Sequence, residues 1–327
     1  MTSMRDTIRA ALPGLLLSAT IALAVRFVSD QLGGPAMLYA LLFGMAFNFL
    51  TEDERFATGI YFASRNILRF GVALLGLRIT VGDVTELGWP VVALVMASVV
   101  VTILVGGLIG RAFGLKGDQS VLSAGAVAIC GASAALAIAS VLPSHKDHER
   151  NTIMTVAGVT ALSTVAMVFY PVFVTYLEYD NATAGVFLGA TIHDVAQVVG
   201  AGYSISEEAG VIATYVKILR VALLPVVMLV VMLSFSGAQQ QRLSVPWFLV
   251  MFALCAVAAN SGLVPSSALA VFNEVSRWCL MIAISALGVK TSLGRIIKVK
   301  PSYSLILIVE TLFLLSIAVI YTMFVAP

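Results

Sequence analysis

Charged residues are scarce in this chain, and so are the residues that build most enzyme or metal sites. Only 11% of its 327 residues are Asp, Glu, Lys or Arg, against about 25% in a soluble domain. The three cysteines form no disulfide framework and no metal-ligand spacing. There is no P-loop, no HExxH motif, no paired-Asp protease motif and no basic patch. We therefore expect no enzymatic activity, no cofactor, no metal and no nucleic-acid partner.

Long apolar runs occupy most of the chain instead. Hydrophobic residues make up 60% of it, and the mean hydropathy is +1.02. Each run of ~20 apolar residues can cross a ~30 Å hydrocarbon core as a helix, and the alternation of a membrane barrel is missing. We expect an all-α polytopic membrane protein with about 11 transmembrane helices and a single transmembrane domain, 1–327. The expected spans are approximately 10–29, 36–50, 57–79, 88–110, 119–142, 151–177, 182–203, 209–235, 246–260, 267–289 and 302–325.

The basic residues between the spans predict the orientation. With a cytoplasmic N-terminus, ten of them fall inside and three outside, which satisfies the positive-inside rule. The inside set is Arg5, Arg9, Arg55, Arg111, Lys116, Arg242, Lys290, Arg295, Lys298 and Lys300, and the outside set is Arg26, Lys146 and Arg150.

Two segments repeat one pattern at an offset of 212 residues. Residues 64–78 (SRNILRFGVALLGLR) align with residues 276–290 (SRWCLMIAISALGVK). The third and tenth spans run in opposite directions, so the repeat is inverted, and it relates segments of about 36–110 and 246–325. Inverted repeats are typical of secondary transporters with a binding site near the bilayer midplane.

The segment 123–140 (SAGAVAICGASAALAIAS) is rich in small residues around Cys130 and Gly131. One interpretation is a helix that unwinds at Gly131, so that the amides of Ala132 and Ser133 form a free helix N-terminus. Such an end binds anions. The alternative is close helix packing through small residues, which is common in membranes.

A second segment, 189–203 (GATIHDVAQVVGAGY), interrupts an apolar run with His193, Asp194 and Gln197. At spacing i, i+4, His193 and Gln197 would share one helical face. An intramembrane ionisable residue is a functional candidate by default, and His193 could titrate near neutral pH. The segment therefore predicts a substrate or proton site, with a solvated loop end or a structural His–Asp pair as the alternative.

Further basic residues fall well inside the spans. They include Arg65 and Arg277, which match across the repeat, and Lys217, which shares a face with Arg220. These cations favour an anionic partner, because Arg suits bidentate contact with oxyanions. The alternative is pairing with the acids within the spans, Asp194, Glu274 and Glu310.

Asn48 and Asn260 also match across the repeat, and each lies at the end of a span. They could cap helix C-termini or contribute polar groups to a central cavity.

Four strings together resemble a known family. FGVALLGLRIT, GAVAICGASAALA, GATIHDVAQVVGAGY and SALGVKTSL are similar to the YeiH-type family of bacterial inner-membrane proteins, whose name refers to sulfate export. The resemblance implies the same membrane and export of sulfate or an organosulfonate. The run from LLGLRIT to ICGASA also resembles the first half of the bile-acid/sodium symporter fold, where a broken helix crosses another at the substrate site. That implies one crossing helix at 125–136 and, as its best counterpart, 189–203.

These observations predict a secondary active transporter of a small anion. The substrate-binding residues would be Cys130, Gly131, Ala132, Ser133, His193, Asp194, Gln197, Arg65, Arg277, Asn48, Asn260 and Lys217. An anion channel would use similar charges without alternating access, and a membrane-embedded enzyme or sensor would need a covalent or metal centre. The lipid bilayer is the expected surrounding, while a coupling H⁺ or Na⁺ and a homodimer stay open.

Overall fold

The structure is a computed structural model, and it describes residues 4–33, 35–79, 81–143, 147–235, 245–262, 264–291 and 301–324. Every regular element within these ranges is helical. Seven helical segments among the described residues are long and apolar enough to cross a membrane, and shorter apolar helices accompany them. The all-α polytopic fold is confirmed, whereas the count of eleven stays a prediction. Of the basic residues used for orientation, Lys146, Arg242, Arg295, Lys298 and Lys300 lie outside the described residues.

The chain divides into two compact units. Unit 1 comprises Met1–Glu86, Val199–Val211 and Pro246–Ser292, and unit 2 comprises Leu87–Val198, Ile212–Val245 and Leu293–Pro327. Each unit has its own internal packing, and the single transmembrane domain expected from the sequence stays a prediction.

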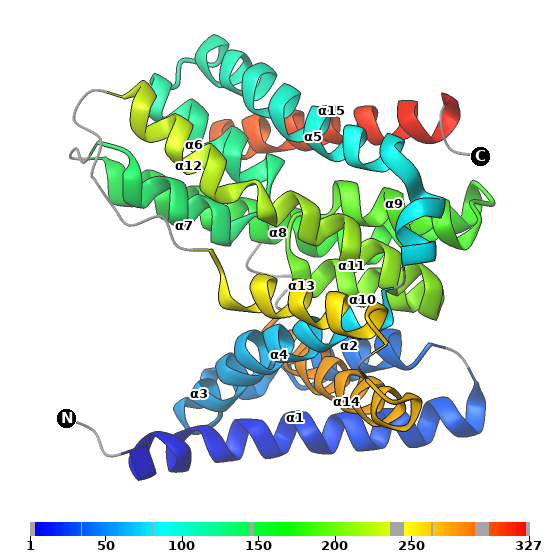
Figure 1. Ribbon diagram of the computed structural model, residues 1–327. Helices are drawn as coiled ribbons and strands as arrows, with labels where there is room; N and C mark the ends of the chain where they lie inside the picture. Colours follow the sequence, from blue (N-terminus) through cyan, green and yellow to red (C-terminus); the bar gives the residue numbers. More distant parts are fainter. Residues whose placement is uncertain are drawn as a thin grey trace. The chain divides into compact units, whose positions relative to one another are not determined.

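Unit 1 is built from helices of both repeat-related segments. Its main elements are α1 (Met4–Leu32), α2 (Ala36–Ala46), α3 (Glu54–Phe62), α4 (Leu68–Leu75), α13 (Trp247–Asn260) and α14 (Ser266–Lys290). Helix α1 lies along α3 and α14, as Figure 1 shows. A π-helical turn, η2 (Ala63–Ile67), and a 3₁₀ turn, η3 (Gly76–Arg78), extend α3 and α4 into one segment, Glu54–Arg78, of membrane-spanning length.

Helices of the two segments pack on each other in unit 1 through matching glycines. Helix α2 packs on α14, and α13 packs on α4. A Cβ on Gly288 would lie 2.4 Å from the carbonyl oxygen of Leu41, and one on Gly76 would lie 2.2 Å from that of Phe252. Only glycine allows backbones to approach this closely. The two glycines differ by the 212 residues of the sequence repeat, although the repeat itself stays a prediction.

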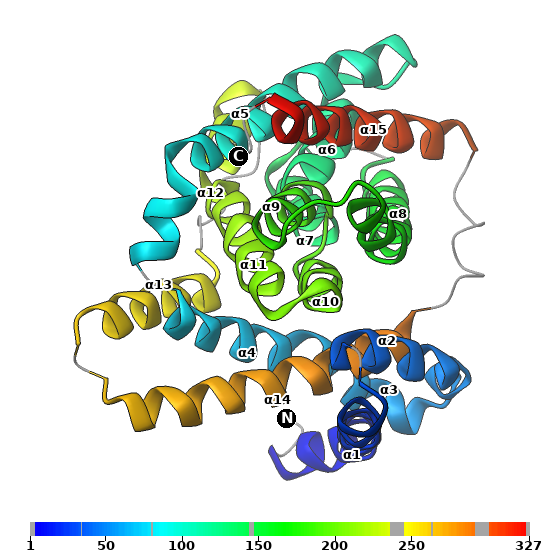
Figure 2. The same ribbon diagram turned by 90° about the vertical axis from the view of Figure 1, so that its right-hand side faces the viewer.

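Unit 2 surrounds two helix breaks. Its elements are the Leu87–Ala112 part of α5 (Val81–Ala112), α6 (Gly117–Ala128), α7 (Ala132–Val141), α8 (His148–Tyr176), α9 (Asn181–Thr191), the first residues of α10 (Val195–Ile205), most of α11 (Glu207–Ala222), α12 (Leu224–Ser234) and α15 (Pro301–Phe324). Figure 2 shows α15 running over α6 and α9. The long helices α8 and α15 thus both pack against α6 and α9, the helices that precede the two breaks.

The first break reverses the direction of the chain. Asp118 at the start of α6 and Leu142 just after α7 line the same small gap, together with His148 at the start of α8. Helix α6 packs along α7, and a Cβ on Gly125 would lie 2.4 Å from the side chain of Ile138. The expectation of one span over 119–142 is therefore wrong. Helices α6 and α7 form a helical hairpin, because the backbone turns back at Gly131 rather than continuing.

Candidate functional site

The tip of this hairpin has the unwound geometry expected around Gly131. Helix α6 ends at Ala128, and Gly131 adopts φ 62°, ψ −124°, a region that residues with a side chain rarely occupy. The first backbone bond into the new helix joins Ala135 N to the Gly131 carbonyl. The amides of Ala132 and Ser133 precede that bond, so they have no acceptor within α7. Ala132 is half-buried and Ser133 is exposed.

The second break lies at Ile192–Asp194, between α9 and α10. A Cβ on Gly131 would be 3.3 Å from the Cβ of His193, so the two breaks meet. His193 precedes the first residue of α10, Val195. The expectation that His193 and Gln197 share one helical face is therefore wrong, since only Gln197 belongs to the helix.

Two buried cations on α11 connect the breaks. Lys217 Nζ donates to the carbonyl of Ile129 at 2.6 Å and to that of Ile192 at 2.8 Å. Arg220, one turn later, donates to Ala128 at 2.5 Å and also to the carbonyl of Ala190. Both side chains are fully buried. They satisfy the orphaned carbonyls that end α6 and α9, where a cation also complements the helix dipole.

Asp194 caps the N-terminus of α10, whereas Lys217 and Arg220 bond to helix C-termini. Its Oδ1 accepts from the amide of Ala196 at 2.8 Å, and its own amide donates to Ser163 Oγ at 3.0 Å. This is an N-cap, in which a carboxylate faces the positive end of the helix. The N-terminus of α10 therefore has its own anion, whereas the N-terminus of α7 begins with the small neutral residues Ala132 and Ser133.

The other polar residues of the second break contact neighbouring helices. His193 Nε2 lies 3.1 Å from Thr311 Oγ1 of α15, and Gln197 Nε2 donates to Thr164 Oγ1 of α8 at 2.9 Å. Both side chains are buried, as is Cys130. The structure thus brings Cys130, Gly131, His193, Asp194, Gln197 and Lys217 to one region of unit 2.

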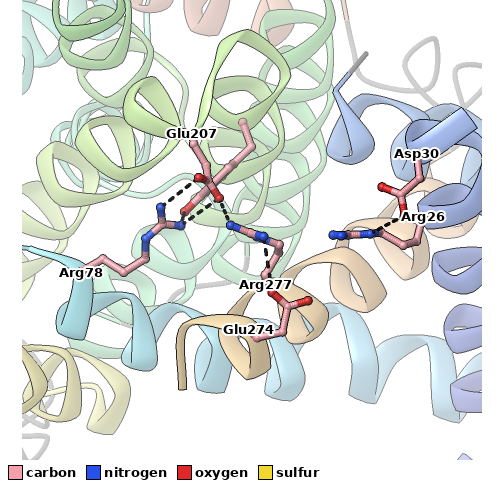
Figure 3. A network of polar contacts seen from close by, with 7 residues as sticks. Arg26, Asp30, Arg78, Glu207, Glu274 and Arg277 are labelled. Carbon is pink, nitrogen blue, oxygen red and sulfur yellow. Dashed lines mark hydrogen bonds and ion pairs between the residues drawn. The ribbon is translucent and has the colours of Figure 1, made fainter. Parts of the chain in front are cut away.

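Arg277 lies in unit 1, beside a cavity of about 490 Å³. Arg26, Tyr203 and Glu207 also line this cavity. Figure 3 shows Arg277 between two carboxylates, an ion pair with Glu207 and a contact of 3.4 Å with Glu274. The expected alternative, pairing with an internal acid, is thus present.

Two further arginines form ion pairs in unit 1. Arg78 contacts Glu207 at 3.4 Å, and Arg26 pairs with Asp30 at 3.0 Å (Figure 3). These three arginines are matched by three carboxylates, Glu207, Glu274 and Asp30. Their charges therefore balance without a bound ion.

Arg65 is not among the residues that line the cavity. Its guanidinium lies 5.5 Å from the centroid of the Tyr61 ring and donates to the hydroxyl of that residue. The structure therefore does not unite Arg65 with Arg277, although the two match in the repeat.

Asn48 and Asn260 make reciprocal contacts in unit 1. Asn48 Nδ2 donates to the carbonyl of Val289 at the end of α14, at 2.7 Å, and Asn260 Nδ2 donates to the carbonyl of Ile79, just after η3, at 2.8 Å. Each amide therefore caps a helix from the other repeat-related segment. The sequence suggested capping at the end of each residue's own helix, and Asn260 Nδ2 also donates to the carbonyl of Ala256 in its own helix at 2.7 Å.

Two residues outside the predicted site prove central to unit 2. Arg220 caps the same helix ends as Lys217. In the sequence, its i, i+3 spacing from Lys217 indicated that the two side chains share a helical face. Glu310 lies buried next to Thr311 and accepts from Ser123 Oγ at 2.9 Å. In the sequence, Glu310 could be recognised as a lone acidic residue within an apolar run.

The chain matches the family described as conserved hypothetical protein 698 over residues 13–323. It is 50% identical over 309 residues to a UPF0324 membrane protein of Chlorobaculum tepidum, covering 92% of this chain and 86% of that protein. It is 46% identical to the UPF0324 membrane protein TauZ of Paracoccus denitrificans, covering 96% and 95%. A UPF0324 membrane protein of Rhizobium meliloti is 43% identical, covering 97% and 93%. No solved structure matches this chain. With these matches along nearly its whole length, the chain belongs to the UPF0324 family of bacterial membrane proteins, the family of conserved hypothetical protein 698.

Proposed function

We propose that this protein is a secondary active transporter of a small anion, such as sulfate or an organosulfonate, in the bacterial inner membrane. It acts without enzymatic chemistry, and its N-terminus faces the cytoplasm. The anion binds in unit 2, where the breaks at Gly131 and His193 meet.

The observation that carries this proposal is the balance of charge at the two breaks. By formal charge, Lys217 and Arg220 contribute two positive charges and Asp194 contributes one negative charge. The two helix C-termini and two helix N-termini hold about half a charge each, of opposite sign, so they cancel. A surplus of about one positive charge remains among the described residues, in a region where uncompensated charge is costly. A bound monovalent anion, or a divalent one with a proton, would balance it.

The open N-terminus of α7 is the natural position for that anion. Its first amides are free of helical acceptors, whereas the start of α10 is capped by Asp194. Helix N-termini hold sulfate, phosphate and carboxylate through such amides.

Two variants of one residue test the position. Ser133→Asp places a carboxylate in the first turn of α7, where it favours the helix dipole and repels an anion. We expect this variant to keep or raise the apparent melting temperature without ligand, and to lose the upward thermal shift that sulfate or a sulfonate gives. Ser133→Asn is the matched control, because asparagine has nearly the same shape as aspartate but no charge. This variant should retain the shift. An equal anion-induced shift in both variants would contradict the position.

Counterflow in proteoliposomes tests the mechanism. A carrier loaded with unlabelled sulfate accumulates radiolabelled sulfate transiently, whereas a channel only equilibrates it. Accumulation in the Ser133→Asn protein and none in Ser133→Asp supports the proposal. Passive equilibration would favour the channel, and transport of none of the tested anions would favour a membrane-embedded enzyme or sensor.

A further inference from the structure

A carboxyl group lies buried in unit 2, apart from the helix ends that the other charged groups cap. Glu310 is the tenth residue of α15, which places it about 14 Å from the start of that helix, and its side chain is fully buried. Its Oε1 accepts a hydrogen bond of 2.9 Å from Ser123 Oγ, and its Oε2 has no hydrogen-bond partner in the described part of the chain.

No cation compensates this carboxyl among the described residues. Helix α5 presents Gly106 to it, where an added Cβ would lie 3.3 Å from Oε1, and α6 presents Ser123. The nearest titratable group on α15 is Tyr303, whose hydroxyl is bound to Thr155 Oγ1 of α8 at 2.6 Å. The charged residues of the helices around α15 lie near their ends: Arg111 on α5, Asp118 on α6, and His148, Glu149 and Arg150 on α8.

An ionised carboxylate in such a buried position has a large free-energy cost. Removing a lone charge from water costs far more than removing a neutral polar group, and inside a protein the group protonates instead. The protonated form needs only one acceptor and one donor, and Ser123 already supplies the donor. A neutral Glu310 would carry its proton on the free oxygen, Oε2.

The neighbours of Glu310 link it to the proposed anion site. Ser123 belongs to α6, whose C-terminal carbonyls are held by Lys217 and Arg220. Thr311, the next residue of α15, contacts His193 at the second break. Helix α15 therefore contacts both broken segments through two consecutive residues, so a change in the charge of Glu310 acts on the packing of both.

We propose that Glu310 is a proton-binding site within unit 2, and that its proton accompanies the anion during transport. The coupling rests on the proposed transport function, whereas proton binding itself does not. Binding converts the carboxylate to a neutral acid, and release leaves a buried negative charge that opposes the surplus positive charge at the breaks. Binding of the anion and binding of the proton are thereby linked, and so are their releases.

Infrared difference spectroscopy tests proton binding without any substrate. A pH titration of the purified, anion-free protein should reveal the carbonyl stretch of a protonated carboxylic acid that disappears as the pH rises. Glu310→Gln should remove this band, and Ser123→Ala should shift it to higher frequency, because the carbonyl oxygen loses its hydrogen bond. Glu274→Gln, which alters an exposed acid paired with Arg277, should leave the band unchanged. An unaltered band in Glu310→Gln would overturn the proposal.

Stability provides a second readout for the same variant. A glutamine oxygen can still accept from Ser123, so Glu310→Gln should melt within a few degrees of the unchanged protein. A large loss of stability, together with no acid band in the unchanged protein, would mean that Glu310 is ionised and paired, and would overturn the proposal.

Transport then tests the coupling, with sulfate as the probe. Glu310→Gln should keep sulfate counterflow at equal pH but lose the stimulation that an imposed pH gradient gives. Equal stimulation in the variant and in the unchanged protein would overturn the coupling. If the unchanged protein carries no sulfate, transport of this anion fails, while the infrared band still decides whether Glu310 binds a proton.

Discussion

The most informative residues of this protein are buried charges that bond to the backbone rather than to each other. Lys217 and Arg220 look like anion ligands in the sequence, because cations inside apolar spans need a partner. The structure shows that their partners are carbonyls of the broken helices. A carbonyl at a helix C-terminus deep in a membrane costs several kcal/mol when unsatisfied, so this bonding is as strong a reason for a buried lysine as a bound substrate.

Removing Lys217 should therefore destabilise the protein even without any anion. Lys217→Met retains most of the side chain but orphans the carbonyls of Ile129 and Ile192, at about 1–3 kcal/mol for each buried group. We expect a markedly lower apparent melting temperature for purified, anion-free protein by differential scanning fluorimetry. Lys116→Met, which alters an exposed lysine, is the control and should melt like the unchanged protein. If Lys217→Met melts normally and only loses anion binding, its main role is that of a ligand.

At the scale of elements, the hairpin of α6 and α7 depends on one backbone conformation. Gly131 combines a positive φ with close contact to His193. Both features penalise a side chain, the first through the backbone and the second through packing. A matched glycine separates them, because Gly114 also has a positive φ, of 84°, but an added Cβ there meets no atom within 4 Å.

Alanine substitutions at these two glycines should differ in cost. Gly114→Ala should lower the free energy of unfolding by about 1–2 kcal/mol, the penalty of a positive φ. Gly131→Ala should cost more, because its backbone region is nearly exclusive to glycine and its Cβ crowds His193. Urea melts of the two purified variants, beside Gly107→Ala at an open helical position, give the comparison. Equal losses at Gly114 and Gly131 would show that the contact between the breaks contributes nothing.

The sequence predicted where the helices of this fold lie better than how they connect. The small-residue cluster around Gly131 predicted the first break. The second segment was located by its polar residues, but His193 and Gln197 were expected on one helical face, so the position of its break was not predicted. The reversal at Gly131 could not be read from the pattern, because the apolar face of α7 has the same period whether the helix continues or turns back. The direction is determined by contacts from far along the chain, such as those of Lys217, which follows Ile129 by 88 residues. The capping by Asn48 and Asn260 was likewise hidden, since it joins segments 241 and 181 residues apart.

At the scale of the whole molecule, the hairpin changes which basic residues are assigned to each side of the membrane. If the chain turns back at Gly131, the residues between α7 and α8 return to the side of Lys116. Lys146 and Arg150 then move inside, and the ten inside residues against three become twelve against one, provided that the later spans keep their orientation. That provision requires a second reversal between α8 and α11. Without that second reversal, the last five residues of the inside set, from Arg242 to Lys300, move outside. The counts then become seven basic residues inside against six outside.

The positive-inside rule therefore predicts that the second break, at Ile192–Asp194, also turns the chain back. The test introduces single cysteines on a background without Cys130, Cys255 and Cys279, and labels spheroplasts with an impermeant maleimide. Glu178→Cys and Glu208→Cys, on either side of the second break, should both react from outside. Lys116→Cys and Arg150→Cys should react only after permeabilisation, which also verifies that each variant is expressed.

The labelling pattern separates the two reversals. Opposite sidedness of the Glu178 and Glu208 variants would mean that α9 and α10 together cross the membrane, and the charge bias would then lose its explanation. Opposite sidedness of the Lys116 and Arg150 variants would contradict the hairpin itself. If both pairs label as expected, the chain enters the membrane from opposite sides at the two breaks, so that Gly131 and His193 meet within it. Each break is then reached from a different side of the membrane, as a carrier that opens to each side in turn requires.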